Sequence, residues 1–295
     1  MRPADCILVR VGEIALKSKQ VQKKFSNILL ENMKAALSAN GVEFNIEANP
    51  NRFFVYTTQI KEAVAALKKV FGLTSISPAW VCFANLEEMN ILASDVGRGA
   101  GLNEKKSFAI RARTAGRHRF SSRIIAEEVG AAVKRATGAR VDLTNPDVEI
   151  FVECRSRHVY IFTEKFACAG GMPVGTAGRV IAVMHGKHAE KAAQLAAKRG
   201  CELTLVFCDR INEKVVKKLL EWHAGREMRV LVTPCEGGDK MMAAIKYADS
   251  IAAKEGAAAI ITAEHFQKIT KTGLEALRKR DMAARIPIFR PILLA

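Results

Sequence analysis

Hydrophobic and polar residues in the first 82 positions repeat with two periods, one typical of strands and one of helices. Residues 5–11 are an apolar run that predicts a buried strand, and apolar positions between Lys17 and Asn40 recur at helical spacing. The pattern then predicts two strands, a helix and a strand, at about 42–47, 52–57, 60–71 and 74–82. This order of elements is the ferredoxin-like pattern, which we expect over residues 1–82.

A basic module follows, and we expect it to occupy residues 83–177. Between Phe108 and Arg113, apolar residues alternate with Arg111 and Arg113, so a strand here would bury one face and present guanidinium groups on the other. Ser121 or Ser122 can cap the helix that follows. The remaining predicted elements are a helix near 86–98 and strands near 148–152 and 159–161. Together they predict a small α+β domain.

From Arg179 onward, short apolar strands alternate with amphipathic helices. The predicted strands lie at 180–184, 203–207, 230–232, 257–261 and near 286–294, and the predicted helices at 188–199, 212–223 and 239–255. Such alternation favours a doubly wound, mainly parallel α/β sheet with helices on both faces. We expect this Rossmann-like domain over residues 178–295.

Charge points to a polyanionic partner. The chain has 46 Lys and Arg against 30 Asp and Glu, a formal net charge of +16 at pH 7. The excess is spread over all three predicted domains rather than held in a tail, which is typical of a folded nucleic-acid-binding surface.

Cysteine usage predicts a reduced protein without a metal site. The seven cysteines are scattered, and no Cys-x-x-Cys pair occurs. No stretch approaches 18 uninterrupted apolar residues, and the N-terminus lacks an apolar signal core. We therefore expect a cytoplasmic protein that does not bind membranes, and we expect no metal.

A strand edge that carries arginines and a glycine-rich loop are features suited to a phosphate backbone. The alternative is an ordinary solvated basic face. The candidate RNA-binding residues are Arg111, Arg113, Arg117, Arg119, Arg123, Lys165, Gly170, Gly171 and Pro173.

Several motifs resemble those of the tRNA 4-thiouridine synthases, the ThiI family. Residues 10–17 (Arg-Val-Gly-Glu-Ile-Ala-Leu-Lys) are similar to the Arg-x-Gly-Glu-x-x-Leu-Lys opening of that family. Residues 108–113, 141–147 and the Gly-Gly-Met-Pro-Val-Gly loop at 170–175 look like landmarks of its THUMP domain. Val180–Met184 onward is similar to the start of its PP-loop ATP-pyrophosphatase domain.

The resemblance implies a tRNA-binding protein with three domains: ferredoxin-like, THUMP and PP-loop. In the family, the first two domains hold the acceptor stem and the single-stranded 3′ end of tRNA. A homodimer is also implied, and a protein partner could use the third domain.

The third domain departs from the family's catalytic pattern. The family's phosphate-cradling Ser-Gly-Gly-x-Asp-Ser loop corresponds here to a stretch with one glycine and neither serine, containing His185, Gly186, Lys187 and His188. The family's Cys-x-x-Cys-x-Arg resembles Cys235-Glu-Gly-Gly238-Asp-Lys240, so the second cysteine and the arginine are replaced. Small residues expose backbone N–H groups to phosphate in such loops, and this degenerate nucleotide loop has lost most of them.

We therefore expect a tRNA-binding relative that lacks ATP-dependent sulfur transfer, with no catalytic residue assigned and no cofactor required. The alternative is a divergent active tRNA sulfurtransferase that uses His185, Lys187 and His188 or a partner subunit, together with ATP and Mg²⁺. Cys235 would then carry sulfur; otherwise it is an ordinary loop cysteine. A weaker alternative is a small-molecule binding protein that uses the carboxyl edge of the parallel sheet.

Overall fold

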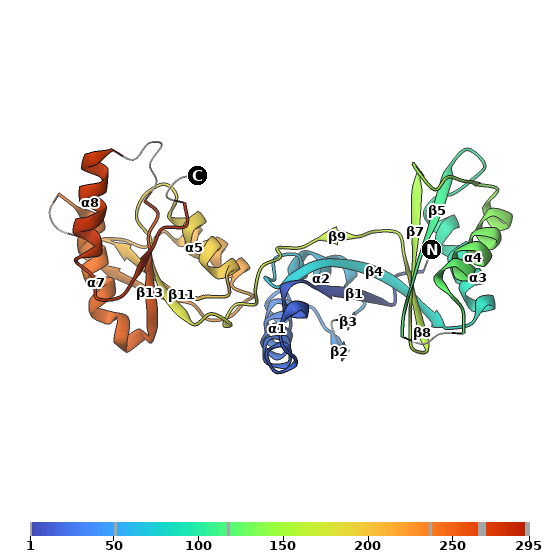
Figure 1. Ribbon diagram of the computed structural model, residues 1–295, viewed down its shortest axis with the longest axis horizontal. Coiled ribbons are helices and arrows are strands. Elements are labelled where there is room, and N and C mark those ends of the chain that lie inside the picture. Colours follow the sequence, from blue (N-terminus) through green and yellow to red (C-terminus); the bar gives the residue numbers. More distant parts are fainter. Residues whose placement is uncertain (1, 50–51, 117–118, 236–237, 265–269, 293–295) are drawn as a thin grey trace. The chain divides into compact units, whose positions relative to one another are not determined.

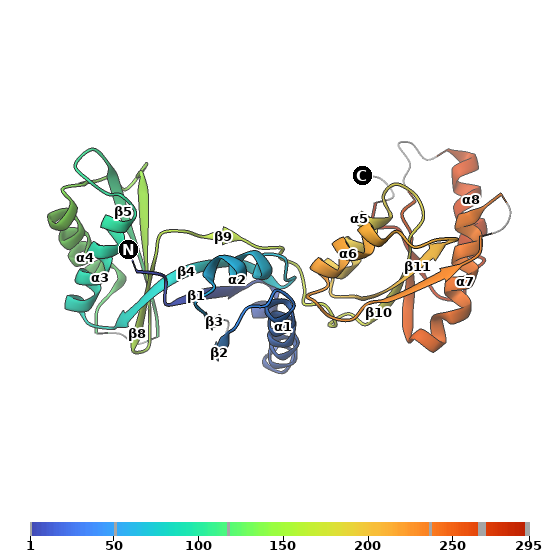
Figure 2. The ribbon, with the colours of Figure 1, turned by 180° about the vertical axis from the view of Figure 1, so that it is seen from behind.

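The computed structural model describes residues 2–49, 52–116, 119–235, 238–264 and 270–292. The chain divides into two compact units, which Figures 1 and 2 show from opposite sides. The first unit combines Met1–Arg10, Val42–Val64 and Ser75–Ala167, and the second combines Val11–Gly41, Ala65–Thr74 and Cys168–Ala295. Each unit thus joins segments that are far apart in the sequence.

A nine-stranded sheet runs through the first unit in the described part of the chain. Its strands are β1 (Cys6–Val11), β2 (Asn45–Asn49), β3 (Arg52–Tyr56), β4 (Leu73–Phe83), β5 (Ser107–Ala115), β6 (Arg140–Val141), β7 (Val148–Arg155), β8 (His158–Phe162) and β9 (Phe166–Ala167). Their spatial order is β2-β3-β1-β4-β8-β7-β5-β6, with β9 also pairing with β4. The long strand β4 therefore links the ferredoxin-like strands to the basic module.

Two cores lie on opposite faces of this sheet. Helices α3 (Leu86–Gly99) and α4 (Ser122–Thr137) pack on the face that carries Phe108, Ile150 and Ile161. On the other face, Tyr160 and Phe162 are buried with Leu8 and Phe54 of the ferredoxin-like strands. Alternation along β8 therefore places apolar or aromatic side chains in both cores.

Local signals explain the bounds of α4. Ser121 is its N-cap, and the Ser121 hydroxyl accepts a hydrogen bond from the backbone N–H of Ile124 at 3.3 Å. Gly138 ends the helix with a φ of +72°, a conformation that glycine adopts without steric cost. The predicted serine cap is confirmed as Ser121.

The second unit contains a five-stranded sheet in the described residues, with the order β12-β11-β10-β13-β14. The strands are β10 (Arg179–Val183), β11 (Glu202–Cys208), β12 (Arg229–Thr233), β13 (Ala257–Ile261) and β14 (Ile288–Phe289), and every pair is parallel. The helices of the unit are a short 3₁₀ turn (Glu13–Leu16), α1 (Lys19–Ala39), α5 (Ala189–Lys198), α6 (Glu213–Trp222), α7 (Lys240–Glu255) and α8 (Lys271–Asp281). Helix α2 (Ile60–Leu67) continues from the first unit into the second.

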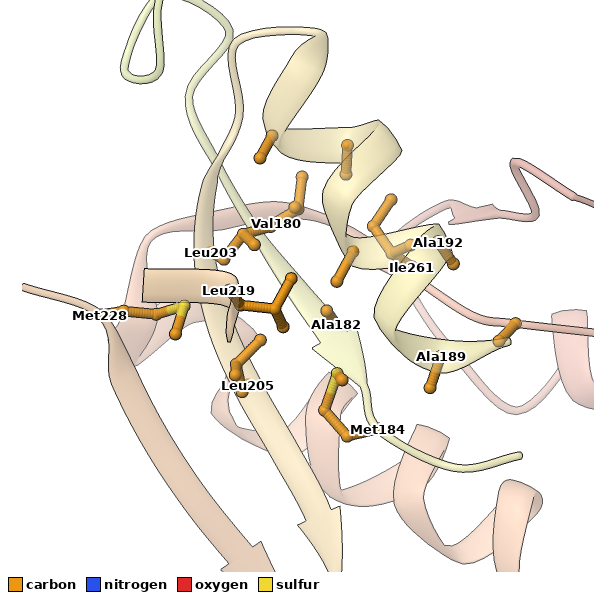
Figure 3. Close-up of a cluster of buried hydrophobic side chains, with 14 of the residues drawn as sticks. Val180, Ala182, Met184, Ala189, Ala192, Leu203, Leu205, Leu219, Met228 and Ile261 are labelled. Atoms are coloured by element: carbon orange, nitrogen blue, oxygen red, sulfur yellow. The ribbon is translucent and has the colours of Figure 1, made fainter. Parts of the chain in front are cut away.

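Helices cover both faces of the parallel sheet, because the strand order reverses beside β10. Right-handed crossovers then place α5 and α6 on one face and α7 on the other. Alternate residues follow the same division: Val180 and Ala182 pack toward α5, and Ile181 and Val183 toward α7. Figure 3 shows the α5 side, where alanines of α5 pack on Val180, Leu203 and Leu205.

The predicted fold class is confirmed: ferredoxin-like and α+β parts are followed by a parallel α/β sheet. Three features were not predicted. Helix α8 carries few apolar residues, β6 and β9 have two residues each, and the last strand is shorter than its apolar run suggested. No described helix combines the length and apolar character needed to cross a membrane.

Candidate nucleic-acid interface

Strand β5 places two of the predicted arginines beside a third from α4. Arg111, Arg113 and Arg123 line one open pocket of about 510 Å³. Arg111 donates from Nε to Glu149 Oε1 at 2.6 Å and from Nη2 to the Leu143 carbonyl at 3.0 Å. Arg123 is highly exposed and pairs with Glu127 one turn later in α4. These three arginines form a shared cationic surface.

The other predicted side chains are not gathered there. Arg119 lines a different pocket, with Phe120 and Arg157, and its guanidinium lies 5.7 Å from the Phe120 ring centroid. Lys165 is exposed before β9. Arg117 lies outside the described residues. RNA binding by these residues stays a prediction.

Three further arginines converge on one buried carboxylate in the first unit. Glu153, on β7, accepts hydrogen bonds from Arg155 Nε at 2.6 Å, Arg52 Nε at 3.3 Å and Arg10 Nη2 at 3.4 Å. The Glu153 side chain is 9% exposed, and those of the three arginines are 11% to 25% exposed. Arg10 also lies over the Phe162 ring, 4.7 Å from its centroid. We call these four charged residues the Glu153 cluster.

Burial and charge act against each other in the Glu153 cluster. Burial lowers the pKa of Arg10 and of Arg52, and the charge of Glu153 opposes that shift. Burial alone would raise the pKa of Glu153, but the Arg155 hydrogen bond and the arginine charges bring it below its ordinary value. The carboxylate is therefore ionised at neutral pH, and the cluster keeps a net charge of about +2.

The Glu153 cluster adjoins the β5 arginines on one sheet surface. The parallel register pairs Arg113 with Glu153 and Arg111 with Phe151. Residues two apart on a strand share a face, so Arg111, Arg113, Glu153 and Arg155 lie on the same side of the sheet. We call this surface the arginine face; its arginines are Arg10, Arg52, Arg111, Arg113 and Arg155, and its carboxylates are Glu149 and Glu153.

The predicted glycine loop is used for packing within the second unit. The backbone N–H of Gly170 donates to the Leu73 carbonyl, that of Met172 to the Lys198 carbonyl and that of Gly175 to the Gly200 carbonyl. A Cβ on Gly171 would lie 2.3 Å from the Lys198 carbonyl oxygen, so only glycine allows this approach. Pro173 is buried beside Gly72. The backbone N–H groups of Gly170, Met172 and Gly175 are thus used in packing within the unit, and RNA contact by Gly170, Gly171 and Pro173 stays a prediction.

The loop over residues 185–188 lies at the carboxyl edge of the parallel sheet, the edge where β10 to β13 end. His185, Gly186 and Lys187 connect β10 to α5, and His188 is the N-cap of α5 without a side-chain cap hydrogen bond. Gly186 has a φ of +90°, which requires glycine. The loop therefore occupies the strand–helix junction at which phosphate-binding loops occur.

Cations at the carboxyl edge are paired with carboxylates of the same domain. Lys240 lies 2.6 Å from Asp209, and Arg280 bridges Asp239 and Glu264. Arg290 also pairs with Glu264 and with Asp281. Asp239 further caps α7 by accepting from the backbone N–H of Met242. Each of these cations already has a carboxylate partner.

Comparison with known proteins places the chain in a family. Two family models match it, the ThiI ferredoxin-like domain over residues 6–77 and the THUMP domain over residues 83–164. A probable tRNA sulfurtransferase of Thermococcus kodakarensis is 32% identical over 319 residues, which cover 98% of this chain and 84% of the relative. The chain belongs to the tRNA sulfurtransferase (ThiI) family. The resemblance predicted from its motifs is confirmed.

One more curated relative and two solved structures are similar to the chain. A probable tRNA sulfurtransferase of Methanothermobacter thermautotrophicus is 31% identical, covering 98% of this chain and 81% of the relative. The crystal structure of PH1313 from Pyrococcus horikoshii matches with a TM-score of 0.85 and 28% identity, covering 98% of this chain and 94% of the other. A 4-thiouridine synthetase, solved in complex with RNA and ATP, matches in fold with a TM-score of 0.83 at 24% identity, covering 98% and 81%.

The Glu153 cluster was missed by sequence reasoning, although one signal was present. Arg10 opens the motif that resembles the start of tRNA sulfurtransferases, but the motif alone does not indicate that Arg10 pairs with a buried carboxylate. Arg52 and Arg155 stand in unremarkable contexts, and only the pairing of β3, β1, β4, β8 and β7 brings them to Glu153. A charged residue between two apolar neighbours was the available clue, since Glu153 follows Val152 and precedes Cys154, both buried.

Proposed function

We propose that this member of the tRNA sulfurtransferase family binds tRNA through its first two domains and lacks ATP-dependent sulfur transfer. The acceptor stem and the single-stranded 3′ end are the expected ligands. The observation that carries the proposal is the arginine face, where five arginines are accompanied by two carboxylates. An excess of guanidinium groups on one sheet surface is suited to phosphate groups.

Contacts within the arginine face support RNA rather than a small anion. Arg10, Arg52 and Arg155 are held by Glu153, while Arg111 and Arg113 lie farther along the same sheet surface. Cations that are spaced along a surface match successive phosphates of a backbone, whereas one small anion would need them around a single point. The match to a THUMP family model over residues 83–164 also supports this proposal.

Charge balance at the carboxyl edge supports the proposed lack of ATP-dependent sulfur transfer. ATP brings several negative charges, which active sites meet with backbone N–H groups, lysines and Mg²⁺. Here Lys240, Arg280 and Arg290 are already paired with carboxylates, and the loop over residues 185–188 contains one glycine. The third domain would then serve as a scaffold, a dimer surface or a site for a protein partner.

A titration with acceptor-stem minihelices tests the proposed tRNA binding. We expect binding that weakens with salt, with a slope of about 0.7–0.9 for each phosphate neutralised. A minihelix that ends in the single-stranded 3′ segment should bind more tightly than one trimmed to a blunt end. Equal affinity for both, or affinity that does not change with salt, would contradict the proposed ligand.

The alternative function is tRNA sulfur transfer with a non-standard loop, as the names of the relatives suggest. His185, Lys187 and His188 lie at the strand–helix junction where ATP phosphates would bind. Expression of the protein in cells that lack their own 4-thiouridine synthase separates the two functions. Appearance of 4-thiouridine in cellular tRNA would establish the alternative, and its continued absence alongside tRNA binding supports a non-catalytic protein.

A further inference from the structure

Two thiols from neighbouring strand ends meet beneath the first turn of α7. Cys208 is the last residue of β11, and Cys235 follows β12 by two residues. The side chains of Cys208 and Cys235 pack in the same cluster, at the ends of adjacent parallel strands. The Cys208 thiol also lies 3.6 Å from the Lys240 carbonyl oxygen at the start of α7. Both side chains belong to the apolar cluster between the sheet and α7.

Backbone contacts hold the two cysteines in register. The backbone N–H of Asp209, next to Cys208, donates to the Thr233 carbonyl at 2.9 Å. In return, the backbone N–H of Cys235 donates to Asp209 Oδ1 at 2.9 Å. The parallel pairing of Cys208 with Thr233 fixes the same alignment. The contact between the thiols is thus built by the strand ends on both sides rather than by one flexible side chain.

We propose that Cys208 and Cys235 are a redox thiol pair, which low-molecular-weight disulfides convert to an intramolecular disulfide. The two thiols differ in access: Cys208 is half-buried, whereas Cys235 is 4% exposed. Cys208 is therefore the residue that meets the oxidant, and Cys235 is the residue that resolves the adduct. This pairing goes beyond the proposed RNA-binding function and uses a cysteine, Cys208, outside the family motif.

The reaction is a sequence of two thiol–disulfide exchanges. The Cys208 thiol loses its proton to solvent, and its sulfur attacks the disulfide RSSR, which forms a mixed disulfide and releases one RS⁻. The Cys235 thiol then loses its proton, and its sulfur attacks Cys208 Sγ and releases the second RS⁻. Two protein thiols are oxidised, one RSSR is reduced to two RSH, and no further oxidant is needed.

Because the Cys208 thiol is protonated at neutral pH, its oxidation is slow there. Burial raises the pKa of the Cys208 thiol to about 12, and the contact with Cys235 acts in the same direction. Because the thiolate is the attacking species, the oxidation rate should rise about tenfold for each pH unit below that pKa. Cys208 and Cys235 should therefore remain two thiols during brief exposure to oxidant and form the disulfide during long exposure.

Oxidation by 2-hydroxyethyl disulfide, a small neutral probe, tests the pair on the unmodified chain. Seven cysteines are present, so titration of thiols after denaturation should fall from seven to five. Peptide mapping should show a linkage between Cys208 and Cys235, formed faster at pH 9 than at pH 7. A stable mixed disulfide on Cys208 without linkage to Cys235 would overturn the proposal, as would linkage that involves other cysteines instead.

Two serine variants assign the order of attack, and a third is the control. C235S should retain one mercaptoethanol group on Cys208, because the resolving thiol is gone. C208S should leave Cys235 unmodified over the same time. C201S removes another half-buried thiol of the same unit and should still form the linkage between Cys208 and Cys235. If Cys235 in C208S were modified as fast as Cys208 is modified in the wild type, the assigned order would be wrong.

Discussion

The arginine face and the carboxyl edge both bring arginines or lysines to carboxylates, but the two regions balance their charges differently. On the arginine face, Glu153 is shared by three arginines, so positive charge remains. At the carboxyl edge, two basic side chains share Glu264, and further carboxylates from Asp209, Asp239 and Asp281 complete the balance. The difference shows that the count of basic residues in a domain does not locate its anion site. Our proposal instead uses the local ratio of cations to carboxylates to locate it.

This comparison also explains why the basic third domain is not our proposed RNA site. Residues 179–295 carry the largest excess of Lys and Arg among the three predicted domains. Part of that excess lies on exposed helix surfaces, such as the last turn of α8 with Arg278 and Lys279, whereas the cations named at the carboxyl edge are paired. Exposed surface charge contributes to long-range attraction of RNA, but it does not by itself form a site.

The largest expected effect comes from removing the carboxylate that the three arginines share. E153Q leaves Arg10, Arg52 and Arg155 partly buried without their counter-charge, so the free energy of unfolding should fall by about 3–5 kcal/mol. E149Q, on the same strand, removes a carboxylate that is 41% exposed and should change stability far less. Chemical denaturation of both variants measures the difference. Equal stability losses would show that Glu153 does not organise the arginine face.

The next effect concerns RNA affinity. The triple variant R111A/R113A/R123A removes the cations that line one pocket, and affinity for tRNA should fall about ten- to hundredfold, with a smaller salt slope. The matched control is R98A, an exposed arginine on α3 that pairs with Asp95 and lies on the helix-covered side of the sheet. Fluorescence anisotropy with labelled tRNA compares the two. If R98A weakened binding as much as the triple variant, the effect would be one of net charge alone.

How much of the fold and of the candidate site can be predicted from the sequence depends on how far apart in the sequence the interacting residues lie. Alternation along β5 and the serine before α4 are local signals, and they predicted the arginine-bearing strand and the capped helix. The Glu153 cluster joins residues 10, 52, 153 and 155, whose meeting depends on strand order across the whole sheet. The glycine loop shows a third case, because its composition indicated close backbone approach but not which partner it approaches.

A smaller effect is expected on the pH dependence of stability, through a buried neutral histidine beside the parallel sheet. His223 is 2% exposed and lies 3.3 Å from the backbone N–H of Leu203, and burial lowers the pKa of its imidazole. The unfolded chain takes up this proton near pH 6.5, whereas the folded protein takes it up only at lower pH. The stabilisation is therefore complete above about pH 6.5 and is lost as the pH falls toward the folded pKa.

Denaturation curves at pH 7.5 and 5.5 measure this loss, which is at most about 1.4 kcal/mol per pH unit for one proton. H223Q removes the titrating group and keeps a side-chain acceptor for Leu203. The wild type should lose more stability than H223Q over this range. The same loss in both proteins would mean that other groups account for the pH dependence.

The smallest expected effect is at the carboxyl edge. K240A removes a half-exposed ion pair with Asp209, and exposed pairs of this kind contribute little. We expect no measurable change in the unfolding midpoint or in tRNA affinity. A several-fold loss of tRNA affinity would indicate that the carboxyl edge also contacts RNA, and it would contradict the contrast between the two regions.

The most direct test of the account is a calorimetric titration of one protein preparation with tRNA and, separately, with Mg-ATP in the presence and absence of tRNA. The account predicts clear, salt-dependent heat on adding tRNA and no detectable heat on adding Mg-ATP under either condition. Micromolar binding of Mg-ATP would contradict it, because the loop over residues 185–188 would then hold a nucleotide despite its single glycine and the paired cations around it.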